Sequence, residues 1–399
     1  MLRRALSTVS LEITALSNRG AGIALHDGLV VFVDGAAPGD QITAKIVAQK
    51  KKRAAEATLL AVERPSPDRR EPACEYFGRC GGCQYQHLSL DAQRRWKRQH
   101  VVDAWRRVAF PGRPRAETAT LVGGEDAAIR VAEVVGTDAE TGYRDKLTPR
   151  SANGATGFAA TRGGALVDVH TCLLARAEIA DAYAATRASG ERCPPLLRLS
   201  EDGRVATAPE TLVERRIAGL SYEFQAGDFF QINAGVADLL VRHVVDRCAG
   251  FRVAVDAYCG VGLFAVAIAK AHGGDVLVHG FDVGGIASAR RNAAANSVSC
   301  DFRVADASKY RFPKGSASEA VVVVDPPRAG LDARFLGRLL AFAPKRIVYV
   351  SCEPATQARD AARLLAGPYA CRDVQPFDMF PSTRHVETVA VFDRVEAPR

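Results

Sequence analysis

The cysteine at position 352 stands where an apolar strand gives way to a helix. Residues 346–350 are typical of a buried strand, and Ser-Cys-Glu-Pro follows at 351–354. A cysteine at the carboxyl end of a strand, just before a helix, can have a lowered pKa and act as a thiolate nucleophile. The alternative is a buried cysteine that packs as a small hydrophobic side chain. We expect Cys352 to be the nucleophile, because neighbouring segments can supply the groups that its chemistry needs.

Two further segments end in groups that could work with this thiolate. The apolar run 321–324 is followed by Asp325 of an Asp-Pro-Pro-Arg string, and an open parallel sheet turns the carboxyl ends of its strands toward the ligand. Near the end of the chain, Glu387 lies close to the start of a strand predicted over 386–392, where a loop can aim it into the same site. Glu387 and His385 are both suitable general bases, and residue type alone leaves the choice open.

A glycine-rich turn could hold a nucleotide. It lies in Asp-Ala-Tyr-Cys-Gly-Val-Gly-Leu-Phe, residues 256–264, between a strand over 252–257 and an alanine-rich helix. Small residues such as Gly260 let the backbone turn sharply and approach a ligand closely. The next predicted strand ends in Asp282, whose carboxylate can accept hydrogen bonds from a ribose diol. This glycine register alone does not distinguish a nicotinamide dinucleotide from another nucleoside cofactor.

Three cysteines lie close together in the first quarter of the chain. Cys74 is separated by five residues from Cys80, and Cys80 by two from Cys83, with glycines that let the loop wrap around a metal. A fourth thiolate is needed to close such a site, and Cys172 is the best candidate. Four soft thiolates select zinc or an iron–sulfur cluster. The spacing lacks the paired Cys-x-x-Cys of a zinc ribbon, so we expect an iron–sulfur cluster, with zinc or no metal as the alternatives.

The pattern of elements predicts an α/β chain of three domains. Residues 8–64 hold short strands broken by Gly, Asp and Asn, typical of a small oligonucleotide-binding (OB) barrel. A central α+β part over 65–235 holds the cysteines. From about 236, strands alternate with amphipathic helices, the pattern of a Rossmann-like, doubly wound sheet. We therefore expect domains over 1–64, 65–235 and 236–399. The strands expected in the barrel are 9–16, 22–26, 28–33, 41–49 and 54–62, and helices are expected over 91–105 and 175–186.

The positive charge is concentrated at the front of the chain. The formal net charge is +8. Residues 1–115 contain 20 Lys and Arg against 11 Asp and Glu, whereas the remainder contains 33 against 34. Clusters such as 50–53 and 94–98 carry much of this excess. A basic region beside a neutral one fits a polyanion-binding module joined to a catalytic domain, and a solvated basic surface without a partner is the alternative.

The sequence gives no sign of a membrane span. No apolar run approaches the roughly 18–20 residues that a span needs. The first ten residues are basic and contain no acid, which is faintly similar to an organelle transit peptide, but they run directly into strand-like sequence. We expect a cytoplasmic, monomeric protein without membrane contact, and organelle targeting is the alternative.

With these residues assembled, the chain resembles the RNA 5-methyluridine methyltransferases of the TrmA/RumA type over nearly its whole length. A TRAM-like barrel, a cysteine quartet, a middle insertion and a C-terminal methyltransferase domain come in the order of that family. The most specific strings are Cys74/Cys80/Cys83, Phe229-Phe230-Gln231-Ile-Asn233, Asp325-Pro-Pro-Arg328, Ser351-Cys352 and His385-Val-Glu387.

The resemblance implies an activity, two cofactors and a partner. The activity is S-adenosylmethionine-dependent methylation of carbon 5 of a uridine in structured RNA, transfer or ribosomal. Cys352 would form a covalent adduct with the uracil, and Glu387 would be the base. A 4Fe–4S cluster would be held by Cys74, Cys80, Cys83 and Cys172. The residues that would line the cofactor and uracil site are Gln231, Tyr258, Gly260, Asp282, Asp306 and Asp325.

The chain departs from the family pattern at three positions. Glu353 stands where the family usually has Asn after the nucleophile, and Leu263 where it often has Asn. Asp145 replaces the Asn of the Tyr-Arg-Asn-Lys string. These differences affect the expected contacts, above all any role for Leu263, and leave the nucleophile and base in place.

Three other functions compete with this expectation. Cytosine-5 RNA methyltransferases share the fold and cofactor but carry a second cysteine at the Asp-Pro-Pro-type loop, and none lies near Asp325. Adenine-N6 methyltransferases place an aromatic residue after Asp-Pro-Pro, where this chain has Arg328. A non-catalytic RNA-binding or redox protein would need neither Cys352 nor Glu387.

Overall fold

The computed structural model describes residues 7–51, 53–152, 154–161, 163–190 and 193–395. Most of the basic first ten residues, and Lys52 of the basic cluster, lie outside the described residues, as do the side chains of Lys50 and Lys51. The chain divides into two compact units. The first consists of 1–96, 149–173 and 380–384, and the second of 97–148, 174–379 and 385–399. The expected division into three domains stays a prediction.

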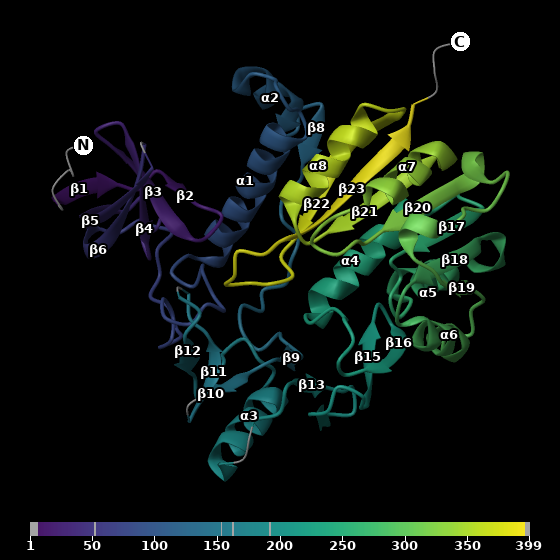
Figure 1. Ribbon diagram of the computed structural model, residues 1–399, viewed down its shortest axis with the longest axis horizontal. Helices are drawn as coiled ribbons and strands as arrows, with labels where there is room; N and C mark the ends of the chain where they lie inside the picture. Colours follow the sequence, from purple (N-terminus) through teal and green to yellow (C-terminus); the bar gives the residue numbers. More distant parts are fainter. Residues whose placement is uncertain (1–6, 52, 153, 162, 191–192, 396–399) are drawn as a thin grey trace. The chain divides into compact units, whose positions relative to one another are not determined.

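The first unit is built on a six-stranded sheet with the order β1-β5-β6-β4-β3-β2 (Figure 1). Neighbouring strands are antiparallel except β4 and β6, which are parallel. The five strands expected in 8–64 are present, the first of them divided into β1 and β2. Alternate residues such as Val31, Val33 and Ile42 are buried, which gives the sheet one apolar core. The strands are β1 (Thr8–Glu12), β2 (Ala15–Leu16), β3 (Ala21–His26), β4 (Leu29–Asp34), β5 (Gln41–Lys51) and β6 (Ala54–Arg64).

A small second sheet completes the strands of this unit. It has the order β10-β11-β12, and glycines at 154 and 163–164 lie in the two hairpin connections. The cysteine loop contacts this sheet, because Gly81 donates a 2.9 Å backbone hydrogen bond to Ala159. The strands are β10 (Arg150–Ala152), β11 (Ala155–Ala159) and β12 (Leu166–Asp168).

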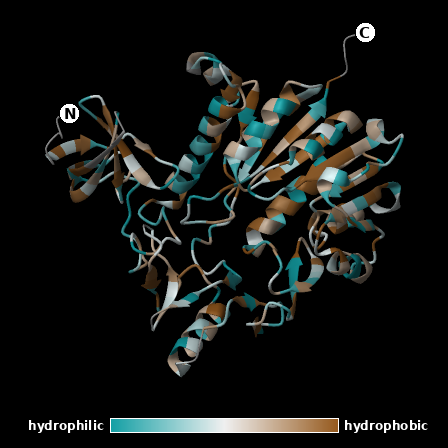
Figure 2. Ribbon diagram, viewed as in Figure 1, coloured by the Kyte–Doolittle hydropathy of each residue, from teal (hydrophilic) through white to brown (hydrophobic). Residues whose placement is uncertain are grey.

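The second unit is built on a nine-stranded sheet with the order β19-β18-β17-β20-β21-β23-β22-β8-β7. All neighbouring strands are parallel except β23, which is antiparallel to both β21 and β22. The central strands are mostly apolar and largely brown in Figure 2, although β17 contains Asp256 and β21 begins with Arg346. The strands are β7 (Val122–Gly123), β8 (Ile129–Val131), β17 (Val253–Ala257), β18 (Leu277–Asp282), β19 (Asp301–Val304), β20 (Ala320–Val324), β21 (Arg346–Ser351), β22 (Tyr369–Phe377) and β23 (Glu387–Arg394).

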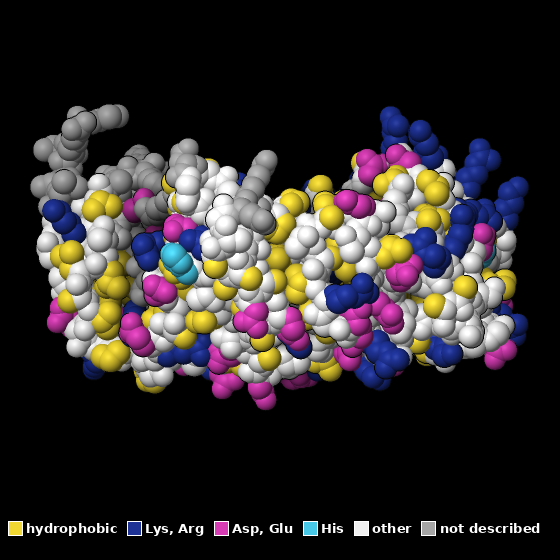
Figure 3. All heavy atoms as spheres, turned by 90° about the horizontal axis from the view of Figure 1, so that it is seen from below, with side chains coloured by type: hydrophobic (Ala, Val, Ile, Leu, Met, Phe, Trp, Pro, Cys, Tyr) yellow, Lys and Arg dark blue, Asp and Glu magenta, His cyan; other side chains and the backbone are white. Residues whose placement is uncertain are grey.

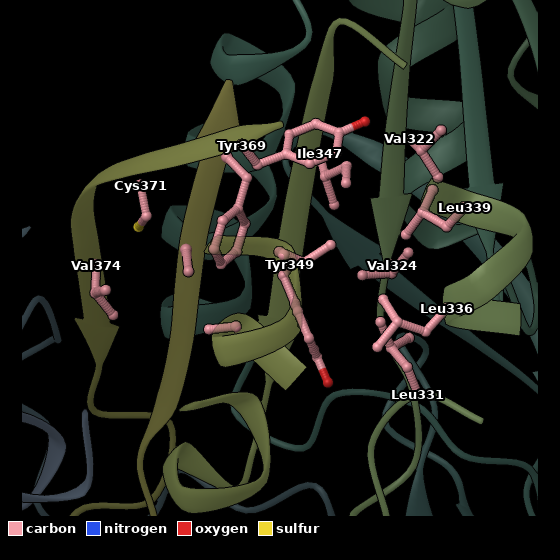
Figure 4. Packing of buried hydrophobic residues seen from close by; sticks show 14 of the residues in the cluster. Val322, Val324, Leu331, Leu336, Leu339, Ile347, Tyr349, Tyr369, Cys371 and Val374 are labelled. Atoms are coloured by element: carbon pink, nitrogen blue, oxygen red, sulfur yellow. The ribbon is translucent and has the colours of Figure 1, made fainter. Parts of the chain in front are cut away.

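Helices cover both faces of this sheet. On one face, side chains of β20 and β21 such as Val322, Val324 and Tyr349 pack with Leu336 and Leu339 of α7, as Figure 4 shows. On the other face, α4, α5 and α6 lie in contact with one another in turn, and α5 packs on β17 and β18. This is the doubly wound arrangement expected from residue 236 onward. The helices are α1 (Leu90–Val108), α2 (Arg115–Leu121), α3 (Ala177–Ser189), α4 (Ala234–Arg247), α5 (Leu263–His272), α6 (Ile286–Ala295), α7 (Ala333–Phe342) and α8 (Pro354–Leu365).

Smaller sheets lie beside the large one in the second unit. One has three strands in the order β14-β13-β9, and the other is the two-stranded hairpin β15-β16. Asn292 of α6 accepts from the backbone N–H of Glu223 at 2.7 Å, which fastens the hairpin to the nine-stranded part. The strands are β9 (Lys146–Leu147), β13 (Leu197–Leu199), β14 (Val205–Ala206), β15 (Leu212–Ile217) and β16 (Leu220–Gln225).

Among the described residues, no helix is both long enough and apolar enough to cross a bilayer. The molecular face drawn in Figure 3 carries Lys and Arg interspersed with Asp and Glu.

Candidate active site

Three neighbouring strands bring three reactive side chains to one edge of the nine-stranded sheet. β20 and β21 are parallel, so Asp325 and Cys352, which follow them, leave the sheet at the same edge. β23 runs antiparallel to β21 with Ser351 opposite Thr388. The residue after Ser351 is Cys352 and the one before Thr388 is Glu387, so this register places the two side by side. The topology therefore assembles a thiol and two carboxyl groups.

The Cys352 thiol lies in an environment that favours its protonated form. Burial raises its pKa to about 11, and the negative charges of Glu387 and Asp325 act in the same direction. Arg328 opposes them through its positive charge. The lowered pKa that the sequence suggested is therefore not present in the unliganded site. Arg328 is the group that favours the thiolate.

The two carboxyl groups of the site share this unusual environment. Burial raises the pKa of Glu387 to about 8, with the charge of Asp325 adding to it and Arg328 opposing it. Asp325 retains some exposed surface, yet desolvation by the surrounding protein raises its pKa to about 7, helped by the charge of Asp282. Carboxyl groups that titrate near neutral pH can take up and release protons under working conditions.

Arg328 is the site residue for which sequence reasoning found no role. The Asp-Pro-Pro-Arg string placed Asp325 and supported the family resemblance, but Arg328 itself counted only as evidence against a base-stacking aromatic residue. The structure shows that this guanidinium acts on both Cys352 and Glu387. The signal that could have revealed this role is the position of Arg328, a cation directly after the two prolines that follow the end of a strand.

The choice between the two candidate bases favours Glu387. It is the first residue of β23 and is only 4% exposed. Its charge acts directly on the pKa of Cys352. His385 is half-buried and precedes the strand by two residues. The position of Glu387 at the strand end is therefore the better one for a base working beside Cys352.

The expected nucleotide turn follows β17 and has the backbone that such a turn requires. Tyr258, Gly260 and Gly262 all have positive φ, at 63°, 52° and 88°. Gly262 then caps the N-terminus of α5. Asp282, at the end of β18, accepts a 2.9 Å hydrogen bond from the backbone N–H of Gly260. The acid and the turn are thus joined as one structure.

Close backbone contacts and a buried acid fix the shape of this turn. A Cβ at Gly285 would lie 2.6 Å from the carbonyl oxygen of Gly260, so glycine is required there. Asp256 is fully buried and accepts a 2.9 Å hydrogen bond from the backbone N–H of Ala265 in α5. Asp256 opens the glycine motif, but no role for it was predicted from the sequence.

The remaining expected cofactor residues come from three neighbouring loops. Asp306 follows β19, is exposed, and accepts a 2.8 Å hydrogen bond from the backbone of Ser308. Its charge and that of Asp332 act on the phenol of Tyr258, although burial is the main reason why the pKa of that phenol is raised to about 12. Gln231 is 3% exposed and lies just before α4. The structure thus brings Tyr258, Gly260, Asp282 and Asp306 together at adjacent strand ends.

The cysteine quartet belongs to the first unit. Cys74 is held by a 3.2 Å hydrogen bond from its backbone N–H to Gln86. Burial raises the pKa of Cys83 to about 12, and the charges of Cys172, Cys74 and Cys80 add to this effect. The other three cysteines therefore lie within electrostatic range of Cys83.

This arrangement is not a metal site as it stands. Within the part of the chain that the structure describes, no three His, Cys, Asp or Glu side chains are arranged so that they could hold a metal ion. The structure therefore does not support the iron–sulfur domain expected from the sequence, and the cluster stays a prediction.

Comparison with protein-family models adds two matches. The family described as tRNA (Uracil-5-)-methyltransferase matches residues 209–395, which include the whole of the site around Cys352. The TRAM domain matches residues 4–60.

Characterised relatives and a solved structure match nearly the whole chain. A tRNA (uracil(54)-C(5))-methyltransferase of Schizosaccharomyces pombe is 32% identical over 97% of this chain and 78% of its own. A 23S rRNA (uracil(1939)-C(5))-methyltransferase of Shewanella sediminis is 31% identical over 96% of each chain. The crystal structure of the Pyrococcus abyssi tRNA (uracil-54, C5)-methyltransferase, in complex with S-adenosyl-L-homocysteine, matches with a TM-score of 0.73 and 26% identity over 96% of this chain and 100% of its own.

Proposed function

Because the chain belongs to the tRNA (uracil-5-)-methyltransferase family and is an RNA (uracil-C5) methyltransferase, we propose that it methylates uridine through a covalent adduct with Cys352, with Glu387 as the base. The observation that carries this proposal is the strand register. Cys352 and Glu387 leave paired strands next to each other, and Asp325 leaves the adjacent strand at the same edge.

The reaction needs both a nucleophile and a base. Carbon 5 of uracil is a poor nucleophile until a thiolate adds to carbon 6 and turns the ring into an enolate. The ionised sulfur of Cys352 forms that bond, and carbon 5 would then take the methyl group from a sulfonium donor, whose sulfur keeps the electron pair of the broken methyl–sulfur bond. The Glu387 carboxylate removes the carbon 5 proton, the ring double bond re-forms, and the sulfur leaves as a thiolate. Arg328 promotes the first step because its charge favours the ionised sulfur.

The methyl donor that this site fits is S-adenosylmethionine, which would supply the methyl group as a sulfonium electrophile. The fit is supported by the turn around Gly260, which is hydrogen-bonded to Asp282 and has no other atom within 4 Å of where a Cβ at Gly260 would lie. The residues that would hold the donor are Gln231, Tyr258, Gly260, Asp282, Asp306 and Asp325. The match to a relative that was crystallised with S-adenosyl-L-homocysteine supports the same assignment.

The substrate is a uridine in structured RNA. The relatives named above act on transfer RNA in two cases and on ribosomal RNA in the third, so both classes belong in a first test. The target base must leave its stack for Cys352 to reach carbon 6. A monomeric state and a cytoplasmic location stay predictions.

An iron–sulfur cluster on Cys74, Cys80, Cys83 and Cys172 is part of the proposal, and it rests on the spacing of these cysteines and on the resemblance to the family. Closing such a site requires the side chains to turn toward a common centre. Iron and acid-labile sulfide should be measured in protein purified without oxygen. About four of each per chain are expected, falling sharply in Cys83→Ser but not in Cys193→Ser. Absence of both would remove the cluster from the proposal.

Trapping with 5-fluorouridine-containing RNA tests the nucleophile. Fluorine replaces the proton that Glu387 removes, so the adduct cannot break down and a covalent protein–RNA complex should accumulate. Cys352→Ser should abolish the complex, and Cys193→Ser, a cysteine away from the site, should retain it. Glu387→Gln should form the complex even with unsubstituted RNA. An undiminished complex in Cys352→Ser would exclude that residue as the nucleophile.

A further inference from the structure

Helix α8 begins two residues after Cys352 and carries two buried polar side chains. Gln357 is 0% exposed and Asp360 is 2% exposed. A spacing of three residues places them on the same side of the helix. Polar groups are costly to bury unless they form hydrogen bonds. The partners of these two residues therefore indicate what they do.

Gln357 joins the two strands that carry the reacting groups. Its Nε2 donates to the carbonyl oxygen of Tyr349 in β21 at 2.9 Å and to that of Thr388 in β23 at 3.4 Å. Its Oε1 lies 2.9 Å from the hydroxyl oxygen of Thr388, which can donate to it. These bonds lie within three residues of Cys352 on one strand and one residue from Glu387 on the other.

Asp360 holds the loop that follows β20. Its Oδ2 accepts 2.8 Å hydrogen bonds from the backbone N–H of Leu331 and from the hydroxyl of Tyr349. Its Oδ1 accepts from the guanidinium of Arg359, which in turn donates to the carbonyl oxygen of Ala329 at 2.9 Å. Two backbone groups of one loop are thus fixed by neighbouring residues of α8.

The same loop packs directly on α8. Gly330 has a φ of +82°, and a Cβ there would overlap the side chain of Thr356 and lie 2.5 Å from Oδ2 of Asp360. Only glycine fits, and the loop cannot move toward the helix. Arg328 lies two residues before this contact, so its position depends on how the loop is held.

We propose that Gln357 and Asp360 are positioning residues for the reacting groups of this site. Gln357 fixes the ends of β21 and β23 relative to each other, and with them Cys352 and Glu387. Asp360 fixes the loop that carries Arg328. The proposal rests on the proposed function, in which Cys352 is the nucleophile, and it deepens that function by naming residues that act through their neighbours.

The reactivity of the Cys352 thiol gives a direct test. The protein without RNA is treated with iodoacetamide over a range of pH, and modification is followed by mass spectrometry of the peptide that contains Cys352. Asp360→Asn should release Arg359 and with it the loop. An amide has one oxygen, so it cannot accept hydrogen bonds both from Arg359 on one side and from Leu331 and Tyr349 on the other. Alkylation at pH 8 should then slow about tenfold, since loss of one nearby opposite charge shifts a pKa by about one unit or more. Arg363→Gln, an exposed change on the same helix, is the matched control.

A double-variant comparison separates positioning from general damage. Arg328→Gln should slow alkylation as Asp360→Asn does, and combining the two should add little, because both remove the same cation from the sulfur. If the effects multiply, Asp360 does not act through Arg328 and the proposal is overturned. Should Asp360→Asn lack the native circular dichroism, Tyr349→Phe removes only one bond to Asp360 and should give a smaller decrease in the same assay.

Methylation kinetics complete the test. Gln357→Met keeps the size of the side chain and removes its hydrogen bonds, so kcat should fall at least tenfold while the Kd for S-adenosylmethionine stays within twofold. Wild-type kcat and alkylation in both Gln357→Met and Asp360→Asn would overturn the positioning role. Normal methylation by Cys352→Ser would instead exclude the nucleophile, and the alkylation comparison would still decide how the thiol is held.

Discussion

The backbone N–H of Gly260 donates a 2.9 Å hydrogen bond to Oδ2 of Asp282, so the glycine turn and the acid that follows the next strand form one structure. The other carboxylate oxygen accepts from the backbone N–H of Gly284 at 3.1 Å. A carboxylate has about four acceptor positions. Asp282 can therefore hold the turn and still accept hydrogen bonds from a ribose.

Replacing Asp282 should weaken binding of S-adenosylmethionine more than it weakens the fold. In Asp282→Asn, one of the two backbone bonds is lost and the amide offers fewer acceptor positions to the ribose. The Kd measured by isothermal titration calorimetry should rise about tenfold or more, which corresponds to about 1.4 kcal/mol. Asp301→Asn, an exposed acid in β19, should leave it unchanged. Equal binding by both variants would exclude Asp282 from the donor site.

The sequence predicted the ends of the central strands well, because buried parallel strands are continuous apolar runs. The run 321–324 became β20 (Ala320–Val324), and Asp325 follows it as expected. The family match also agrees with uracil rather than cytosine as the target, as the absence of a cysteine near Asp325 had indicated.

Other features could not be predicted, because they depend on contacts between distant segments. β8 is three residues long and pairs with β22, more than two hundred residues away, so no local pattern announces it. The raised pKa of Cys352 comes from burial and from Glu387 and Asp325 on other elements. A helix that begins Pro-Ala-Thr-Gln does not reveal that Gln357 will bond to two strands.

The rate of methylation should depend on pH through Glu387. The pKa of this carboxyl is raised to about 8 and that of Asp325 to about 7, and the two titrate together. The base is the ionised form, so the single-turnover rate should fall about tenfold per unit as pH drops below about 8. Asp325→Asn removes one of the negative charges that raise the Glu387 pKa. Its profile should shift to lower pH, and an unchanged midpoint would contradict the coupling.

The rate of methylation should rise with pH, whereas the contribution of Glu387 to protein stability should fall with pH. The raised pKa of Glu387 means that its protonated form is favoured in the fold, while the unfolded chain ionises near 4.5. The contribution of Glu387 to the free energy of unfolding is fully present below about pH 4.5 and is lost as the pH rises toward about 8. Glu387→Gln removes the cost of burying the ionised carboxylate. At pH 8.5 it should raise the free energy of unfolding by on the order of a few kcal/mol, and the unfolding midpoint with it. At pH 5 the increase should be much smaller. Exposed Glu319→Gln is the control, and equal effects at both pH values would contradict the burial argument.

Asp145, one of the departures from the family pattern, forms a buried ionic cluster in this chain. Its Oδ2 lies 3.2 Å from Nε of Arg215 and its Oδ1 lies 3.7 Å from Nε of Arg198. All three residues are less than 10% exposed, and the Arg198 guanidinium also stacks on Phe224. Burial raises the pKa of Asp145 while the two arginines lower it. Burial is the larger effect, so the pKa of Asp145 lies above its usual range.

Asp145→Asn should therefore destabilise the protein even though it restores the residue type that the family usually has. It would leave the buried Arg198 without its ion-pair partner, while Arg215 keeps Glu201 at 3.5 Å. Removing one partner of a buried ion pair costs about 3–5 kcal/mol. The thermal midpoint, followed by differential scanning calorimetry, should fall clearly. Asp202→Asn breaks an exposed pair with Arg204 and should leave the midpoint unchanged. A stable Asp145→Asn protein would mean that the arginines are compensated elsewhere, and that the aspartate at this position is not needed to balance them.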